Sequence, residues 1–231
     1  MGARVVSLVP SATETLLALG VRPIACTRFC EQPGLATVGG TKDPHIAAII
    51  DLAPDLVVVN DEENRHEDAA ALLAAGVALH SMSPRSVADV GVAVDALAAV
   101  LGVASLEIRL PARTPTRGRA VTFVWRRPWM TQSADTYGSS LLEHLGWINP
   151  FAGDPARYPV TDLTAVGARS PDAVVLPSEP YPFGRRHVPE ITIAVPDARV
   201  VLLDGRDLFW WGTRTPGALA RIGSILAAAV G

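Results

Sequence analysis

The chain has 231 residues, of which 49% are hydrophobic and 19% are charged, a composition that excludes a disordered protein. Its 20 basic and 23 acidic residues give a net charge of −3, without the basic excess typical of nucleic-acid binding, so we expect no nucleic-acid partner. No stretch reaches the ~20 apolar residues of a membrane span, so we expect no membrane-embedded segment.

Apolar runs alternate with amphipathic segments along the first part of the chain. Nearly continuous apolar runs of this length are typical of strands buried in a parallel sheet. The expected strands cover residues 5–9, 56–59 and 77–82. A helix capped by Ser11 or Thr13 and ended by Gly20 follows the first strand, and further helices cover residues 46–52 and 67–75.

The second half of the chain repeats this order. The expected strands cover residues 121–125, 173–176 and 199–203, and the expected helices cover residues 139–145 and 163–168. The landmark Pro54-Asp55 recurs as Pro171-Asp172, and Leu19-Gly20 recurs as Leu145-Gly146. Ordinary α/β alternation also produces loose similarity of this kind, but a duplication is the simpler explanation.

We therefore predict an α/β protein with two Rossmann-like lobes of the same plan. The N-terminal lobe covers residues 1–82 and the C-terminal lobe covers residues 119–231. Residues 83–118 lie between them. In this segment a helix begins at Ser83 or Ser86 and ends at Gly102, and an irregular, proline-containing connector follows.

Polar residues follow the expected strands of the N-terminal lobe, at the edge where open parallel sheets bind ligands. The first helix begins near Ser11, where backbone N–H groups can meet an anion, but an ordinary helix cap is the favoured interpretation. The charged run at residues 60–65 fits a solvated loop as well as a binding site. The candidates in this lobe are Ser11, Arg28, Phe29, Asn60, Glu62, Glu63, Asn64 and Arg65.

The loops of the C-terminal lobe are rich in aromatic residues. All five tryptophans lie beyond residue 120, and four of them are in loops that follow strands. Aromatic rings usually fill cores, but loops that combine Trp, Tyr, Pro and Arg suit a large, flat, partly apolar ligand, and we favour binding. The candidates in this lobe are Trp125, Trp129, Glu179, Tyr181, Phe183, Trp210 and Trp211.

Catalytic motifs are missing from the sequence. The glutamates Glu62, Glu63 and Glu179 are potential general acids, but no nucleophile is paired with them in the sequence. The two cysteines, Cys26 and Cys30, are interpreted as free structural thiols, with a disulfide or half of a metal site as alternatives. We expect no metal site and no enzyme activity.

Six motifs together resemble the cobalamin-binding branch of the class III (TroA-like) substrate-binding proteins, also called helical-backbone metal receptors. They read SLVPSATE at 7–14, GGTKDP at 39–44, PDLV at 54–57, EENR at 62–65, WRRPWM at 125–130 and PSEPYPFG at 177–184. The resemblance covers nearly the whole chain. It implies two α/β lobes bridged by one helix, with a shallow ligand cleft between them.

The resemblance also implies a function. Its members bind cobalamin, heme or ferric siderophores and deliver them to an ABC importer, and no cofactor beyond the ligand is expected. Thr41 and Lys42 join the candidates through their motif, and Tyr158 joins by alignment. Phe29 and Tyr158 keep the aromatic character of cleft positions in cobalamin-binding members, whereas Thr41 and Asn60 do not.

The chain departs from the family in three places. Members that dock on importers carry an exposed glutamate on each lobe, and the aligned positions here are Ala47 and Thr164, so we expect no direct permease contact. The bridging helix, ended by Gly102, is shorter than in the family. The first strand follows directly after residue 4, without a recognisable signal peptide, so we expect a cytoplasmic protein.

The leading hypothesis is non-catalytic binding of cobalamin or a similar metal chelate. One alternative is the exported subunit of an importer for cobalamin, heme or siderophores, with a misassigned start. The other is an enzyme or chaperone that acts on the chelate.

Overall fold

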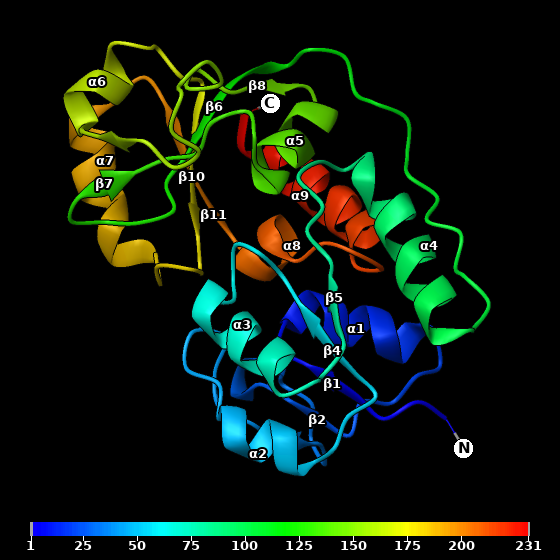
Figure 1. Ribbon diagram of the computed structural model, residues 1–231. Helices are drawn as coiled ribbons and strands as arrows, with labels where there is room; N and C mark the ends of the chain where they lie inside the picture. The colour runs from blue at the N-terminus through cyan, green and yellow to red at the C-terminus, as the bar shows by residue number, and fades with distance from the viewer. Residues whose placement is uncertain (1, 231) are drawn as a thin grey trace. The chain divides into compact units, whose positions relative to one another are not determined.

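The computed structural model describes residues 2–230, which divide into two compact α/β units (Figure 1). Unit 1 contains the chain up to Pro84, together with Ala88–Ile108 and Trp211–Arg214. Unit 2 contains Arg85–Val87, Arg109–Trp210 and the chain from Thr215 onward. Parallel sheets in both units confirm the predicted fold class.

Unit 1 is built on a five-stranded parallel sheet. Its order is β3 (Ala36–Thr37), β2 (Ala25–Cys26), β1 (Val5–Ser7), β4 (Leu56–Val59) and β5 (Leu79–Ser81). In the register, Val6 of β1 faces Ala25 on one side and Val57 on the other. The central strands are buried on both faces, which explains their nearly continuous apolar sequence.

Four α-helices belong to unit 1. They are α1 (Pro10–Ala18), α2 (Ile46–Asp51), α3 (His66–Ala74) and α4 (Asp89–Leu101), and a short 3₁₀ helix, η1 (Arg28–Cys30), follows β2. Ile49 of α2 and Leu72 of α3 pack with strand residues such as Val57 in a buried core. Gly102 ends α4 with a φ of +66°, a conformation that favours glycine.

The expected cap of the first helix is wrong. The strand stops at Ser7, Val9 is the N-cap residue without a side-chain bond, and Pro10 is the first helical residue. Proline suits this position because its fixed φ matches the helix and its missing N–H leaves no bond unmade. Ser11 and Thr13 therefore lie inside the first turn instead of before it.

Unit 2 is built on a four-stranded parallel sheet in the order β11 (Arg199–Leu203), β10 (Ala173–Pro177), β6 (Gly118–Thr122) and β8 (Trp147–Ile148). A separate antiparallel pair joins β7 (Trp129–Met130) to β9 (Val160–Thr161). The helices are α5 (Tyr137–His144), α6 (Leu163–Gly167), α7 (Val188–Ala194), α8 (Gly205–Phe209) and α9 (Thr215–Val230), and a 3₁₀ helix, η2 (Arg185–His187), leads into α7.

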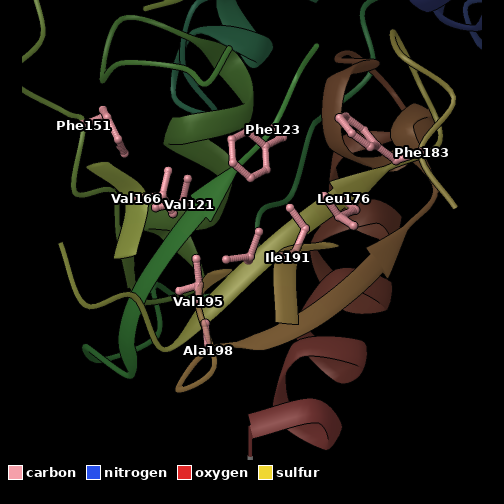
Figure 2. Packing of buried hydrophobic residues seen from close by; sticks show 10 residues of the cluster. Val121, Phe123, Phe151, Val166, Leu176, Phe183, Ile191, Val195 and Ala198 are labelled. Carbon is pink, nitrogen blue, oxygen red and sulfur yellow. The ribbon is translucent and has the colours of Figure 1, made fainter. Parts of the chain in front are cut away.

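The core of unit 2 lies over β6 and β10. Figure 2 shows Val121 of β6 and Leu176 of β10 beside Ile191 of α7 and Val195, the residue that follows this helix. Phe123 and Phe183, which follow the two strands, extend this core toward their carboxyl ends (Figure 2). The core therefore anchors the bases of the two loops that carry the aromatic motifs.

The strand expected at residues 121–125 is misplaced by three residues. β6 begins at Gly118 because Gly118 and Arg119 pair with β8, which is distant in sequence. Phe123 N–H still donates to the Val175 carbonyl of β10 at 3.1 Å, and beyond it the backbone turns to a new partner, since Val124 N–H donates to the Met130 carbonyl at 2.9 Å. Within residues 2–230, none of the helices combines the length and apolar character that crossing a bilayer requires.

Candidate functional site

An aromatic cluster lies where β6 and β10 end in unit 2. We define it as Phe123, Trp125, Trp129, Tyr181 and Phe183. Trp129 and Phe183 are stacked, with ring centroids 6.0 Å apart and planes inclined by 4°. Tyr181 contacts Phe183 at 4.6 Å and meets Trp125 edge-on at 5.5 Å, while Phe123 lies 4.5 Å from Trp129.

The aromatic cluster runs from the core to the surface. Phe123 and Phe183 are buried, Trp129 and Tyr181 are half-buried, and the side chain of Trp125 is 43% exposed. The inner rings thus fix the outer ones through contacts of the offset and edge-on type that aromatic pairs prefer. The outer rings offer an apolar, polarisable surface to a ligand.

Cations accompany the aromatic cluster. Arg126 forms two hydrogen bonds with Glu190 Oε2, at 2.7 and 3.1 Å, and its guanidinium carbon lies 5.5 Å from the centre of the Trp129 ring. The Glu190 carboxylate raises the pKa of Arg126. Three further arginines of these loops are exposed: Arg127, Arg185 and Arg186.

His187 lies behind the Tyr181 and Phe183 rings. Its Nδ1 accepts a hydrogen bond from the Gly184 N–H at 3.1 Å, and its ring meets Tyr181 and Phe183 edge-on at 5.6 and 5.3 Å. The side chain is buried, and burial lowers its pKa. The positive charges of Arg186 and Arg126 act in the same direction.

Glu179 is held by a tryptophan. The Trp210 indole N–H donates to Glu179 Oε1 at 2.6 Å, and the Gly205 N–H donates to Ser178 Oγ at 2.9 Å. Gly205 lies so close to the Glu179 backbone that a Cβ atom there would come within 2.6 Å of its nitrogen. The Glu179 carboxylate therefore connects the β10 loop to Trp210, the residue after α8, and Ser178 connects the same loop to Gly205 at the start of α8.

The polar loops of unit 1 are joined by two buried asparagines. Asn60 accepts hydrogen bonds from the backbone N–H groups of Glu62 and Glu63, at 2.8 and 3.0 Å, and donates to the Met82 carbonyl. Asn64 donates to the carbonyls of Leu8 and Thr41. Because the side-chain amides of Asn60 and Asn64 are hydrogen-bonded to backbone groups, we interpret both asparagines as supports of the site and not as ligand contacts.

Other side chains of unit 1 lie in the loops that follow β2 and β3, at the carboxyl ends of these strands. Arg28 pairs with both oxygens of Asp43 at 3.0–3.1 Å, and its guanidinium lies 4.8 Å from the ring centre of Phe29, which is 48% exposed. Lys42 Nζ donates to the Glu62 carbonyl at 2.6 Å. This edge thus presents one aromatic ring beside cations that are already partnered.

The structure brings together some predicted residues and separates others. Trp125, Trp129, Tyr181 and Phe183 form one cluster, and Glu179 meets Trp210. Trp211 is buried and belongs to unit 1, although its neighbour Trp210 belongs to unit 2. Of the remaining candidates, Ser11 is buried, Tyr158 and Thr41 are half-buried, and Arg65 forms an ion pair with Asp68 at 2.8 Å.

Sequence reasoning missed Phe123, Arg126 and Glu190 as parts of this arrangement. A signal existed for Phe123, because it precedes Trp125 by two residues in an extended segment, and alternate residues of a strand share a face. None existed for the pair of Arg126 with Glu190, which are 64 residues apart.

The two cysteines of unit 1 are free and buried, as expected for structural thiols. Cys30 Sγ accepts a hydrogen bond from Thr13 Oγ1 at 3.1 Å and lies 3.2 Å from Thr27 Oγ1. A hydrogen bond from the Cys26 thiol, together with these hydroxyls, lowers the pKa of Cys30 to about 6 against the opposing effect of burial. The same interaction and burial raise the pKa of Cys26.

Among residues 2–230 no group of three or more His, Cys, Asp or Glu side chains is placed to hold a metal ion.

Comparison with known proteins identifies the fold. No family model matches the chain. The periplasmic vitamin B12-binding protein of Vibrio cholerae is similar in structure, with a TM-score of 0.78, 19% identity, and coverage of 99% of this chain and 98% of that one. The periplasmic heme-binding protein BhuT, in complex with two hemes, has a TM-score of 0.81 and 20% identity, with coverage of 99% of this chain and 99% of that one. The periplasmic heme-binding protein RhuT of Roseiflexus sp. RS-1, in its apo form, has a TM-score of 0.80 and 20% identity, with coverage of 100% of both chains. The chain thus has the fold of periplasmic solute-binding proteins, as the sequence resemblance implied.

Proposed function

We propose that this protein binds a metal chelate with a large planar ring, a heme or a corrinoid, without converting it chemically. The observation that carries this proposal is the aromatic cluster of unit 2, in which Trp125 is exposed and Trp129 and Tyr181 are half-buried near the carboxyl ends of two parallel strands. Flat macrocycles bind through stacking and edge contacts with such rings, and the buried inner rings hold the outer ones in place before binding.

The loops around the aromatic cluster carry an excess of positive charge. Arg126, Arg127, Arg185 and Arg186 outnumber the carboxylates Glu179 and Glu190. This charge favours a ring with carboxylate substituents, as in heme, over one with neutral amide substituents, as in cobalamin. The corrinoid expected from the sequence resemblance is then the second ligand to test.

A role in uptake is supported by the structural neighbours, which are periplasmic proteins that bind vitamin B12 or heme. They favour the exported subunit of an importer over the cytoplasmic location expected from the sequence. Cell fractionation of the native organism, followed by N-terminal sequencing of the isolated protein, tests this assignment. Recovery in the cytoplasm with an intact start would contradict it.

A second candidate function is binding without importer docking. The observation in its favour is that Ala47 of α2 and Thr164 of α6 are both exposed and uncharged. A permease surface that relies on arginines would find no carboxylate at either position. Capture of an ABC permease by the ligand-loaded protein in the native membrane would rule this candidate out.

The ligand itself is tested by titrating the purified protein with hemin and with hydroxocobalamin while tryptophan fluorescence is followed. We expect a saturable quench, because the macrocycle would lie against Trp125. Trp125→Ala should weaken binding at least tenfold, a loss of about 1.4 kcal/mol. The control is Ile193→Ala, which removes a more exposed apolar side chain, 82% exposed against 43% for Trp125, on α7 of the same unit. Absence of saturable binding with both chelates would overturn the proposal.

A further inference from the structure

The loop that carries Tyr181 and Phe183 is closed by a single imidazole. The segment after β10 turns at Gly184, and the Gly184 N–H donates to His187 Nδ1 at 3.1 Å. The same ring contacts both aromatic side chains edge-on. His187 thus contacts the loop at its backbone and at two of the rings that we assign to ligand binding.

The bond to Gly184 requires a ring nitrogen with a free lone pair. A neutral imidazole has one such nitrogen, whereas the imidazolium carries an N–H on both nitrogens and cannot accept any hydrogen bond. Arg186 Nε lies 3.4 Å from the other nitrogen, Nε2. Because the neutral ring has one acceptor, the closer Gly184 N–H takes the lone pair on Nδ1, and Nε2 then carries the ring hydrogen. A proton added to His187 would therefore set N–H against N–H at Gly184.

The charges around His187 oppose its protonation. Arg186 belongs to the same 3₁₀ helix, and Arg126 faces it from the loop after β6. Glu190 of α7, the carboxylate that acts on it among residues 2–230, is already paired with Arg126 at 2.7 Å. The ring of Tyr181, whose phenol is titratable, also contacts the imidazole. Because His187 is only 4% exposed, water cannot solvate a new charge on its ring unless the loop moves.

We propose that His187 is a positioning residue that holds the Tyr181–Gly184 loop in its binding conformation only while its imidazole is neutral, so that acidification releases the loop and the chelate. The proposal rests on the proposed function, because it names the regulation of the same aromatic cluster. Its physical basis is linkage: if the ligand binds only the conformation with neutral His187, every proton taken up by that ring competes with the ligand.

Two variants separate this role from simple packing. In His187→Asn the amide oxygen takes over the place of Nδ1 as an acceptor for the Gly184 N–H, but the side chain does not titrate. In His187→Phe the ring contacts are kept and the acceptor is lost. His66→Asn is the matched control, because it removes an exposed histidine at the start of α3 in unit 1.

The first experiment measures affinity for hemin and for hydroxocobalamin at pH values from 8 to 5. For the wild type and His66→Asn we expect affinity to fall as the pH is lowered. The total fall is about tenfold for each pH unit by which the pKa of His187 is lower in the ligand complex than in the free protein. His187→Asn should bind with an affinity that changes little with pH, and His187→Phe should bind weakly throughout. A wild-type affinity that is constant from pH 8 to 5, or a pH profile that His187→Asn retains, would overturn the proposal and leave the proposed function intact.

The second experiment needs no ligand. Hydrogen exchange of the Gly184 amide is measured in the wild-type protein at the same pH values, after correction for the intrinsic exchange rate. We expect protection that disappears on acidification, and protection that persists in His187→Asn. If neither chelate binds but this pattern is found, the loop device stands and the proposed function fails. Protection of Gly184 that is independent of pH in the wild type would refute the device directly.

Discussion

Replacing Gly205 by alanine would place a methyl group against the backbone of Glu179. The added Cβ would lie 2.6 Å from the Glu179 nitrogen and 2.7 Å from its carbonyl oxygen, and the side-chain Cγ is also in the way. Contacts below 3.0 Å cannot be relieved by a side-chain rotation when the partner is backbone. The loop after β10 and the first turn of α8 must therefore separate, which strains the bonds from Gly205 N–H to Ser178 and from Trp210 to Glu179.

The expected cost follows from these contacts. Overpacking of a tight site costs about 1–3 kcal/mol, and we expect the upper part of this range because backbone atoms are involved. For a chain of this length, ~2–3 kcal/mol corresponds to a fall in Tm of about 4–12 °C. Thermal unfolding followed by circular dichroism measures this shift. The control is Gly153→Ala, where a Cβ would meet no atom within 4 Å.

The outcome that would refute this reasoning is equally definite. If Gly205→Ala and Gly153→Ala unfold at the same temperature, the loop after β10 is not packed against α8 as described. A loss of chelate binding by Gly205→Ala without any change in Tm would also refute it, because the clash would then be relieved at no cost to the fold.

Three further predictions concern single side chains. Trp210→Phe removes the indole donor to Glu179 and should lower the free energy of unfolding by about 1 kcal/mol in urea titrations, whereas Trp210→Ala, which also loses the ring, should cost more. Thiolate absorbance at 240 nm should rise with a midpoint near pH 6 in the native protein, and Cys30→Ser should abolish this transition while Cys26→Ser shifts it upward. Because the folded protein lowers the pKa of His187, the unfolded state takes up more protons on this residue below about pH 6.5. The stability that it contributes is complete above that pH and is lost as the pH falls, so His187→Asn should flatten the decline in urea midpoint between pH 6.5 and 5; an unchanged slope would contradict this.

The sequence by itself determined the class of the fold. Runs such as residues 56–59 and 199–203 are apolar at every or nearly every position, and both are strands with the predicted bounds. β4 is buried on both faces, so each of its residues points into an apolar layer, whereas β11 keeps the apolar run although Leu202 is 37% exposed. The alternation with helices then predicts a parallel sheet, and its carboxyl edge as the place for a ligand.

The sequence also selected most of the aromatic residues that form the cluster. Trp125, Trp129, Tyr181 and Phe183 were predicted together from their place in two loops, and they are in contact. The prediction was possible because β6 and β10, the strands before these loops, end at the same edge. The ligand assigned to these residues stays a prediction.

Only the tertiary structure decided which polar residues support the site and which face solvent. Asn60 and Asn64 look like ligand residues in a charged run, but their amides bond backbone groups of three other segments. Trp210 and Trp211 are neighbours in the chain and belong to different units. The physical reason is that sequence periodicity depends on neighbouring residues and reports only which face of an element is buried. The partner of a side chain depends instead on strand order and loop packing, which bring together residues such as Arg126 and Glu190 from distant parts of the chain.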